Sequence, residues 1–254
     1  FPIIGLSETW HTENSVDRYG LSGYNSVHEY RCSRRGGGVS MYIQDSIEFS
    51  RGTDLQVFSD VVDCVFIEIS GHSMSQRSNI IIGVIYRPPN TNIEVFNSEM
   101  NNCLLAMKSE NKPCFLMGDF HINLLNCNSH SNTNAFLNAM YSHFFFPLIT
   151  KASRVQHGSS TLIDNIFTNC ITQSHLLKPG MLVTDISDHY VIFCICREKF
   201  GTKQSMKPVY RRIFSDTNIS KFKSLIEEQD WQSVYEEQKA QESFTQLQKL
   251  VKTC

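Results

Sequence analysis

Short apolar runs of strand length recur along the first part of the chain, separated by polar segments. The runs are rich in β-branched and aromatic residues, which favours strands over helices. They cover residues 3–6, 39–43, 61–69, 80–86, 114–117, 162–167 and 190–196. The run 61–69 partly alternates, as a half-buried strand does, whereas 80–86 is apolar throughout and predicts a strand covered on both faces.

Two segments between these runs have helical spacing instead. Apolar residues recur every three or four positions over residues 92–110 and again over 133–144, which predicts two amphipathic helices. Pro88 and Pro89 separate the strand 80–86 from the first of them, because proline cannot continue a helix or a ladder. Strands with helices inserted between long loops predict an α/β fold with a two-sheet core and helices outside it.

The pattern changes near residue 200. Residues 201–208 form a polar linker, and 219–251 are rich in Gln and Glu with an apolar stripe at helical spacing. We therefore predict two domains: a catalytic-type α/β domain over 1–198, and a linker with an amphipathic helical connector over 199–254. The chain opens on Phe1 within a strand-like run and without Met, so we expect an N-terminally truncated fragment whose first strand is missing.

Composition narrows the class of protein. With 41% hydrophobic and 19% charged residues the chain is globular in type. The formal net charge of -2 does not indicate a strongly basic nucleic-acid binder, and residues 31–38, "RCSRRGGG", form the one basic patch.

The nine cysteines have no metal-ligand or disulfide spacing, which predicts free thiols in a reducing, intracellular compartment. No signal peptide or membrane-spanning run is apparent, so a membrane partner is not expected.

Polar side chains gather where apolar runs end. Taken singly, each of these residues can be explained as a turn or a cap. Several carboxylates and histidines at strand ends make a shared site more probable than separate turns. The candidates are Glu8, Tyr86, Arg87, Asn90, Asp119, His121, Asp164, Asp185, Asp188 and His189.

Metal-assisted phosphodiester cleavage is the chemistry that suits these residue types. Mg²⁺ takes oxygen ligands and keeps several waters, so one or two carboxylates suffice to hold it. It neutralises the charge that develops on phosphoryl oxygens. A carboxylate or imidazole must activate the attacking water, and a catalytic histidine needs a partner on its other ring nitrogen.

The ordered series "LSET", "YRPPN", "GDF", "IDNIF" and "SDH" closely resembles the endonuclease/exonuclease/phosphatase superfamily, also called DNase I-like. Within it, "RRGGGVSMYI" and "GDFHINLLN" resemble the apurinic-type endonuclease domain of non-LTR (LINE-type) retrotransposon polyproteins. The resemblance covers residues 3–196. It implies a four-layer α/β sandwich, in which two packed β-sheets are flanked by helices.

The resemblance also implies where metal and phosphate bind. Glu8 is expected to be the principal metal ligand, with Asp188 in the metal and phosphate neighbourhood. Tyr86 is expected to contact the scissile phosphate, with help from Asn90. Arg34 and Arg35, in the basic patch, are candidates for contacts to DNA phosphate.

Proton transfer is assigned by the same resemblance. Asp119 is expected to position or activate the water, and His189 to touch the phosphate or move a proton. Asp164 is expected to hold His189 in orientation. His121 is a departure, because the family usually has Asn at this position, with an amide that donates to the phosphate. Imidazole can also donate, with a different reach and a charge that depends on pH.

The function implied is an Mg²⁺-dependent DNA endonuclease, with Mn²⁺ as a possible substitute and no small-molecule cofactor. It would nick one strand of target DNA in the nucleus, as part of a larger polyprotein that contains a reverse transcriptase. One alternative is a degenerate, non-catalytic copy that acts at most as a binding module, favoured by His121 and the missing first strand. Another is a phosphatase or related phosphoesterase of the same superfamily.

Overall fold

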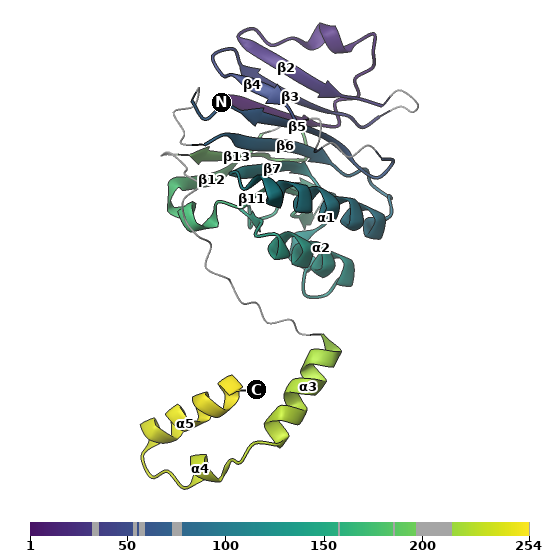
Figure 1. The fold of residues 1–254 in the computed structure, drawn as a ribbon. Helices are drawn as coiled ribbons and strands as arrows, with labels where there is room; N and C mark the ends of the chain where they lie inside the picture. Colours follow the sequence, from purple (N-terminus) through teal and green to yellow (C-terminus); the bar gives the residue numbers. More distant parts are fainter. Residues whose placement is uncertain are drawn as a thin grey trace. The chain divides into compact units, whose positions relative to one another are not determined.

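The computed structural model describes residues 1–31, 36–52, 55, 59–72, 78–156, 158–184, 186–196 and 215–253 (Figure 1). The chain divides into two compact units, Phe1–Gln204 and Ser205–Cys254, and each is described by itself. The predicted linker 201–208 lies outside the described residues.

A mixed β-sheet forms the centre of the first unit, with the strand order β4-β5-β6-β7-β11-β8. Its strands are β4 (Phe49–Arg51), β5 (Asp63–Ile69), β6 (Ile80–Tyr86), β7 (Cys114–Asp119), β8 (Phe146–Pro147) and β11 (Asp164–Thr168). Neighbouring strands are antiparallel except for β6 and β7, which are parallel. A parallel pair needs a long crossover connection, and helix α1 (Ile93–Glu110) supplies it.

A second β layer packs against one face of this sheet. It contains a sheet of order β1-β3-β2 and the pair β12-β13. Its strands are β1 (Ile3–Ser7), β2 (Tyr24–Glu29), β3 (Val39–Gln44), β12 (Leu177–Leu182) and β13 (Val191–Cys196). Buried residues of β3, β5 and β6 form one hydrophobic core between the layers. Shorter elements are η1 (Val16–Tyr19), η3 (Leu124–Asn126), η4 (Ile171–Leu176) and the hairpin strands β9 (Arg154–Gln156) and β10 (Ser159–Thr161).

Helices α1 and α2 (Ser131–Ser142) cover the opposite face of the central sheet (Figure 1). The side chain of Asn92 caps α1 by accepting hydrogen bonds from two amides of its first turn. In the core beneath the helices, the rings of Phe96, Phe120, Phe136 and Phe167 are all fully buried or nearly so. Phe136 lies at the centre of this cluster and contacts the other three rings. Helices that pack on one face of two stacked sheets confirm the predicted α/β class.

Each predicted long strand and helix is present, with ends shifted by a few residues. The strands β2, β4, β8, β9, β10 and β12 were not predicted. Most are short, and β12 contains Pro179 and Gly180, residues that are uncommon inside strands. The described cysteines are free thiols, as predicted, and Cys64, Cys103, Cys114 and Cys170 are buried.

The second unit is helical, as expected for the tail. It contains α3 (Asp216–Glu227), α4 (Gln232–Tyr235) and α5 (Ala240–Thr253). Ser215 caps α3 by accepting from the amide of Asn218, and Trp231 donates its ring N–H to the carbonyl of Ile226. Among the described helices of both units, none combines the length and the apolar character that crossing a membrane requires.

Gly118 generates a prediction about stability. Its φ is +146°, and a Cβ at this position would lie 1.9 Å from the carbonyl oxygen of Ile85 in the neighbouring strand. We expect Gly118→Ala to lower the free energy of unfolding by about 2 kcal/mol or more, because both the backbone angle and the close strand resist a side chain. Urea denaturation measures this difference.

Gly20→Ala is the matched control. Gly20 has a φ of -64° and no atom within 4 Å of a built Cβ, so the free energy of unfolding should change by less than about 1 kcal/mol. Equal effects of the two substitutions would contradict the account of Gly118.

Candidate active site

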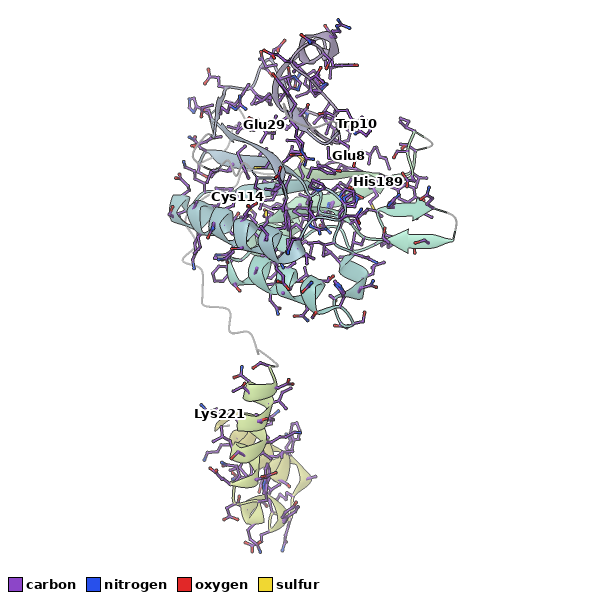
Figure 2. The ribbon with its side chains drawn as sticks, turned by 90° about the vertical axis from the view of Figure 1, so that its right-hand side faces the viewer. Glu8, Trp10, Glu29, Cys114, His189 and Lys221 are labelled. Carbon is purple, nitrogen blue, oxygen red and sulfur yellow. The ribbon has the colours of Figure 1, made fainter. Side chains whose placement is uncertain are left out.

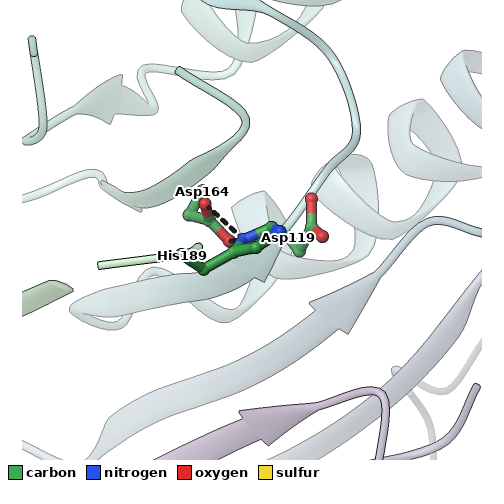
Figure 3. A group of neighbouring side chains, drawn as sticks. All are labelled: Asp119, Asp164 and His189. Carbon is green, nitrogen blue, oxygen red and sulfur yellow. Dashed lines mark hydrogen bonds and ion pairs between the residues drawn. The ribbon is translucent and has the colours of Figure 1, made fainter. Parts of the chain in front are cut away.

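A row of polar residues crosses one end of the central sheet, fixed by strand register. Tyr86, at the end of β6, pairs with Asp119 at the end of the parallel strand β7. Asp119 pairs in turn with Asp164, the first residue of the antiparallel strand β11. Directly paired residues of neighbouring strands point to the same face, so these three side chains lie next to one another, facing the second β layer. Figure 3 shows Asp119 and Asp164 together with His189.

The Asp164 carboxylate holds His189, which lies on the loop that enters β13. Nδ1 of His189 is 3.0 Å from both carboxylate oxygens of Asp164 (Figure 3). Asp164 is buried. The hydrogen bond that His189 donates to Asp164 raises the pKa of His189 above its ordinary value, although burial opposes the shift. With Nδ1 engaged, the other ring nitrogen of His189 is the one that can act on a substrate.

Asp119 pairs with a second histidine, His121. Nδ1 of His121 lies 3.1 Å from Oδ2 of Asp119, and the His121 amide donates to Oδ1 at 2.9 Å. Asp119 is only 3% exposed. Burial raises the pKa of this carboxyl, and the negative charge of Asp164 adds to the increase, whereas the contacts with His121 oppose it. The site therefore contains two neighbouring Asp–His pairs.

Tyr86 connects this row to Glu8, the residue after β1. The Tyr86 hydroxyl donates to Oε1 of Glu8, and the Tyr86 ring meets the His121 ring edge-on at a centroid distance of 5.9 Å. Tyr86 is almost fully buried; burial raises its pKa, and Glu8 raises it further. The hydroxyl therefore stays protonated, and Glu8 accepts its one proton. Glu8 itself is exposed and is labelled in Figure 2.

Backbone conformation at the predicted site residues is unusual. Glu8, Asn90 and His121 have φ angles of 54°, 62° and 46°, in the left-handed region that non-glycine residues rarely adopt. Such conformations gather at functional sites, where the surrounding structure holds them. Asn and His are both enriched in this region, so the backbone at position 121 accepts the histidine.

The row does not include the remaining predicted residues that the structure describes. Asn90 is exposed in the turn after β6. Asp188 forms an ion pair with Arg154, with 2.6 Å between Nε and Oδ2, and this guanidinium lowers the pKa of Asp188. Arg34, Arg35 and Asp185 fall outside the described residues.

Three further residues support the site, and two of them, Asp63 and Ser153, were not predicted from the sequence. Asp63 pairs with Tyr86 in the sheet and accepts from Nε of Arg31 at 2.7 Å. Ser153 is fully buried and donates to Oδ2 of Asp164 at 2.7 Å. The buried Arg87 donates to the carbonyl of His121 at 3.1 Å. Arg87 was among the candidates of the "IYRPPN" motif, but no pattern singles out Asp63 or Ser153.

A metal ion fits this set of donors. Within the part of the chain that the structure describes, Asp119, Asp164 and His189 each offer a ligand atom, and these atoms lie within 4.8 Å of one another. Nδ1 of His189 is engaged by Asp164, so the donors of this cluster are mainly carboxylate oxygens. Glu8 is not part of the cluster, and its carboxylate accepts from Tyr86. Hard oxygen donors suit Mg²⁺ or Mn²⁺ rather than a soft metal.

Comparison with solved structures assigns the fold to a class. The chain has a DNase I-like fold, which it shares with solved structures among its structural neighbours. No protein-family model matches the chain, and no curated protein sequence matches it.

Three structural neighbours illustrate the likeness. The endonuclease domain of TRAS1, a telomere-specific non-LTR retrotransposon, is 14% identical with a TM-score of 0.59, over 78% of this chain and 87% of that one. The 3'-5' exonuclease NExo from Neisseria meningitidis is 12% identical with a TM-score of 0.57, over 78% and 90%. The APE2 catalytic domain from Xenopus laevis is 15% identical with a TM-score of 0.53, over 77% and 84%. At these identities the likeness establishes the fold.

The Asp164–His189 pair predicts a pH-dependent contribution to stability. The pKa of His189 is raised in the folded state, so folding favours the imidazolium form. The stabilisation is fully present below the unfolded pKa, near 6.5, and is lost as the pH rises through the folded pKa. The difference in free energy of unfolding between wild type and His189→Gln should therefore be larger near pH 5 than near pH 9. Urea titrations at several pH values measure it.

His175→Gln, at an exposed position of η4, is the control, and its effect should vary less with pH. A His189→Gln difference that grows as the pH rises would contradict the assigned pairing.

Proposed function

We propose that this chain is a metal-dependent phosphodiester hydrolase that cleaves DNA. The observation that carries the proposal is the row of Tyr86, Asp119 and Asp164 across three strands, with a histidine on each carboxylate. In this row Asp119 can accept the proton of water, and the imidazole of His189 is held in one orientation. Carboxylate oxygens of the site can bind a hard cation. Phosphodiester hydrolysis uses these three kinds of group. The DNase I-like fold supports the same chemistry by analogy alone.

Each residue then has a role in one displacement. Water attacks phosphorus, and the bond from phosphorus to the leaving oxygen breaks. Asp119 accepts the proton of the water, a task helped by burial, which raises its pKa and makes it a stronger base than an exposed aspartate. Asp164 holds Nδ1 of His189, so the opposite ring nitrogen donates to a phosphoryl oxygen. The His121 ring lies beside this pair and would donate to the phosphate. The Tyr86 hydroxyl would do so after turning away from Glu8, to which it donates its one proton.

A hard cation completes the proposed site. Glu8 is the carboxylate that would hold Mg²⁺, or Mn²⁺ in its place, as the motif resemblance implies. The ion would supply charge neutralisation at the phosphoryl and leaving oxygens.

The narrower proposal is a nickase for retrotransposition. Its support is the motif resemblance to LINE-type endonuclease domains, together with the likeness to the TRAS1 endonuclease domain. In that role the substrate is one strand of nuclear target DNA, and the nick primes reverse transcription by a polymerase of the same polyprotein. Arg34 and Arg35 would contact DNA phosphate.

A second candidate is a folded but non-catalytic copy. The observation that favours it is His121, which replaces the amide expected in the family. The left-handed backbone at this position accepts His as well as Asn, so the substitution changes the donor and not the fold. A phosphatase of the same fold class is separated from the nuclease by competition between inositol phosphates and DNA.

The first test of the proposed function is nicking of supercoiled plasmid in Mg²⁺ and in EDTA. We expect Mg²⁺-dependent nicking by the wild type, and a loss on the order of 100-fold or more in His189→Ala and in Asp119→Asn, because each removes a group that moves a proton. His121→Asn should retain activity. Gel quantification of open-circular product measures all four proteins.

Folded wild type that never nicks would contradict the catalytic proposal. Activity that appears only in His121→Asn would support the degenerate copy instead.

The basic patch gives a separate prediction about DNA binding. Replacing Arg34 and Arg35 by Ala should weaken binding and reduce the slope of log affinity against log salt by about 1 to 2, because fewer counterions are released from DNA. Fluorescence anisotropy of a labelled duplex at several salt concentrations measures the slope. An unchanged slope would show that these arginines do not contact phosphate.

A further inference from the structure

The segment Ser153 to Val155 contacts both the residues around His189 and the carboxylate that holds it. On the backbone side, Arg154 forms an antiparallel bridge with His189. The Val155 amide donates to the carbonyl of Asp188 at 3.0 Å, and the Tyr190 amide donates to the carbonyl of Ser153 at 2.7 Å. The loop before β13 is therefore fastened to this segment on both sides of His189.

Side chains of the same segment reinforce the attachment. Nε of Arg154 donates to Oδ2 of Asp188 at 2.6 Å, and its Nη2 donates to Gln156 at 3.3 Å. The guanidinium is thus fixed between the hairpin β9-β10 and the residue before His189. About one third of each side chain is exposed in this pair, so the pair lies at the rim of the site and not in its interior.

Ser153 acts on the other half of the Asp164–His189 pair. Its hydroxyl donates to Oδ2 of Asp164 at 2.7 Å and accepts from the amides of Ile163 and Asp164 at 3.2 and 2.9 Å. One fully buried hydroxyl therefore fixes both the carboxylate and the backbone of the first residue of β11.

We propose that Arg154 is a positioning residue for His189, and that Asp188 serves as its anchor and not as a metal ligand. This inference rests on the proposed function. One carboxylate oxygen of Asp188 accepts a hydrogen bond from the guanidinium of Arg154 at 2.6 Å. A carboxylate engaged in this way is poorly placed to bind a cation, since the fixed positive charge repels the metal.

The Arg154–Asp188 ion pair would fix the position of the His189 ring. His189 must present its ring within a narrow tolerance to assist the displacement, and a misplacement of about 1 Å costs on the order of 100-fold in rate. Arg154 holds Asp188, the residue before His189, and Ser153 holds Asp164. Residues 153–155 therefore set the backbone and the ring orientation of His189 together.

The test uses the full chain with Arg154→Ala, Arg154→Lys, Asp188→Asn and the double variant Arg154→Ala with Asp188→Asn. We expect kcat for plasmid nicking to fall roughly 10- to 100-fold in Arg154→Ala with little change in KM, and Arg154→Lys to recover part of the loss. The double variant should be no worse than the poorer single variant, because both single changes break one interaction.

Mg²⁺ titration of kcat separates anchoring from metal binding. Asp188→Asn should leave the half-saturating Mg²⁺ concentration within about 3-fold of the wild type, whereas loss of a ligand should raise it about 10-fold or more. Arg51→Ala is the matched control: it breaks an ion pair with Glu29, on a strand separated from β11 by β5, β6 and β7.

A readout that does not depend on activity keeps the two proposals separate. In ¹⁵N-histidine-labelled protein, the His189 ring nitrogens should report one fixed tautomer in the wild type and in Arg51→Ala. They should shift or broaden in Arg154→Ala. Unchanged His189 signals in Arg154→Ala, or a raised Mg²⁺ requirement in Asp188→Asn, would overturn the positioning role. Wild type that fails to nick DNA would contradict the proposed function, and the nuclear magnetic resonance result would still decide the role of Arg154.

Discussion

The register between β6, β7 and β11 is the constraint on which the site depends. It pairs Tyr86 with Asp119 and Asp119 with Asp164, so three strands that are distant in sequence deliver one polar group each to the same end and face of the sheet. A shift by one residue along any of these strands would turn its side chains to the opposite face. The close approach at Gly118, where only a glycine fits against Ile85, helps to fix the register of β7.

This register also creates an electrostatic problem, because two aspartates lie directly opposite each other. Like charges at paired positions destabilise a sheet, and burial adds to the cost of ionising Asp119. His121 and His189 compensate by each pairing with one carboxylate. The two aspartates consequently differ: Asp119 is a buried carboxyl with a raised pKa, whereas Asp164 accepts a hydrogen bond from His189. Different environments for neighbouring titratable groups are how one site separates its proton-transfer roles.

Much of this arrangement was predictable from the sequence, for physical reasons. Long apolar runs define β5, β6 and β7 because both faces of these strands are buried, and polar residues after such runs mark the end of the sheet. The pairing of Asp164 with His189 followed from the motif resemblance. Register and side-chain pairing were not predictable, since nothing local in the sequence connects Asp63 to Tyr86, Ser153 to Asp164, or Arg154 to Asp188. The hairpin β9-β10 was missed because its strands are three residues each and partly exposed.

A crystal structure of the chain soaked in Mn²⁺, with anomalous diffraction data, tests the central claim most directly. The account predicts one strong anomalous peak at Glu8, together with an intact Asp164–His189 hydrogen bond, with Asp188 still bound to Arg154. A peak on Asp188, with Arg154 displaced, would contradict the assignment of Asp188 as an anchor. A chain that binds no Mn²⁺ at Glu8 or at the row of Tyr86, Asp119 and Asp164 would contradict the metal-dependent hydrolase itself.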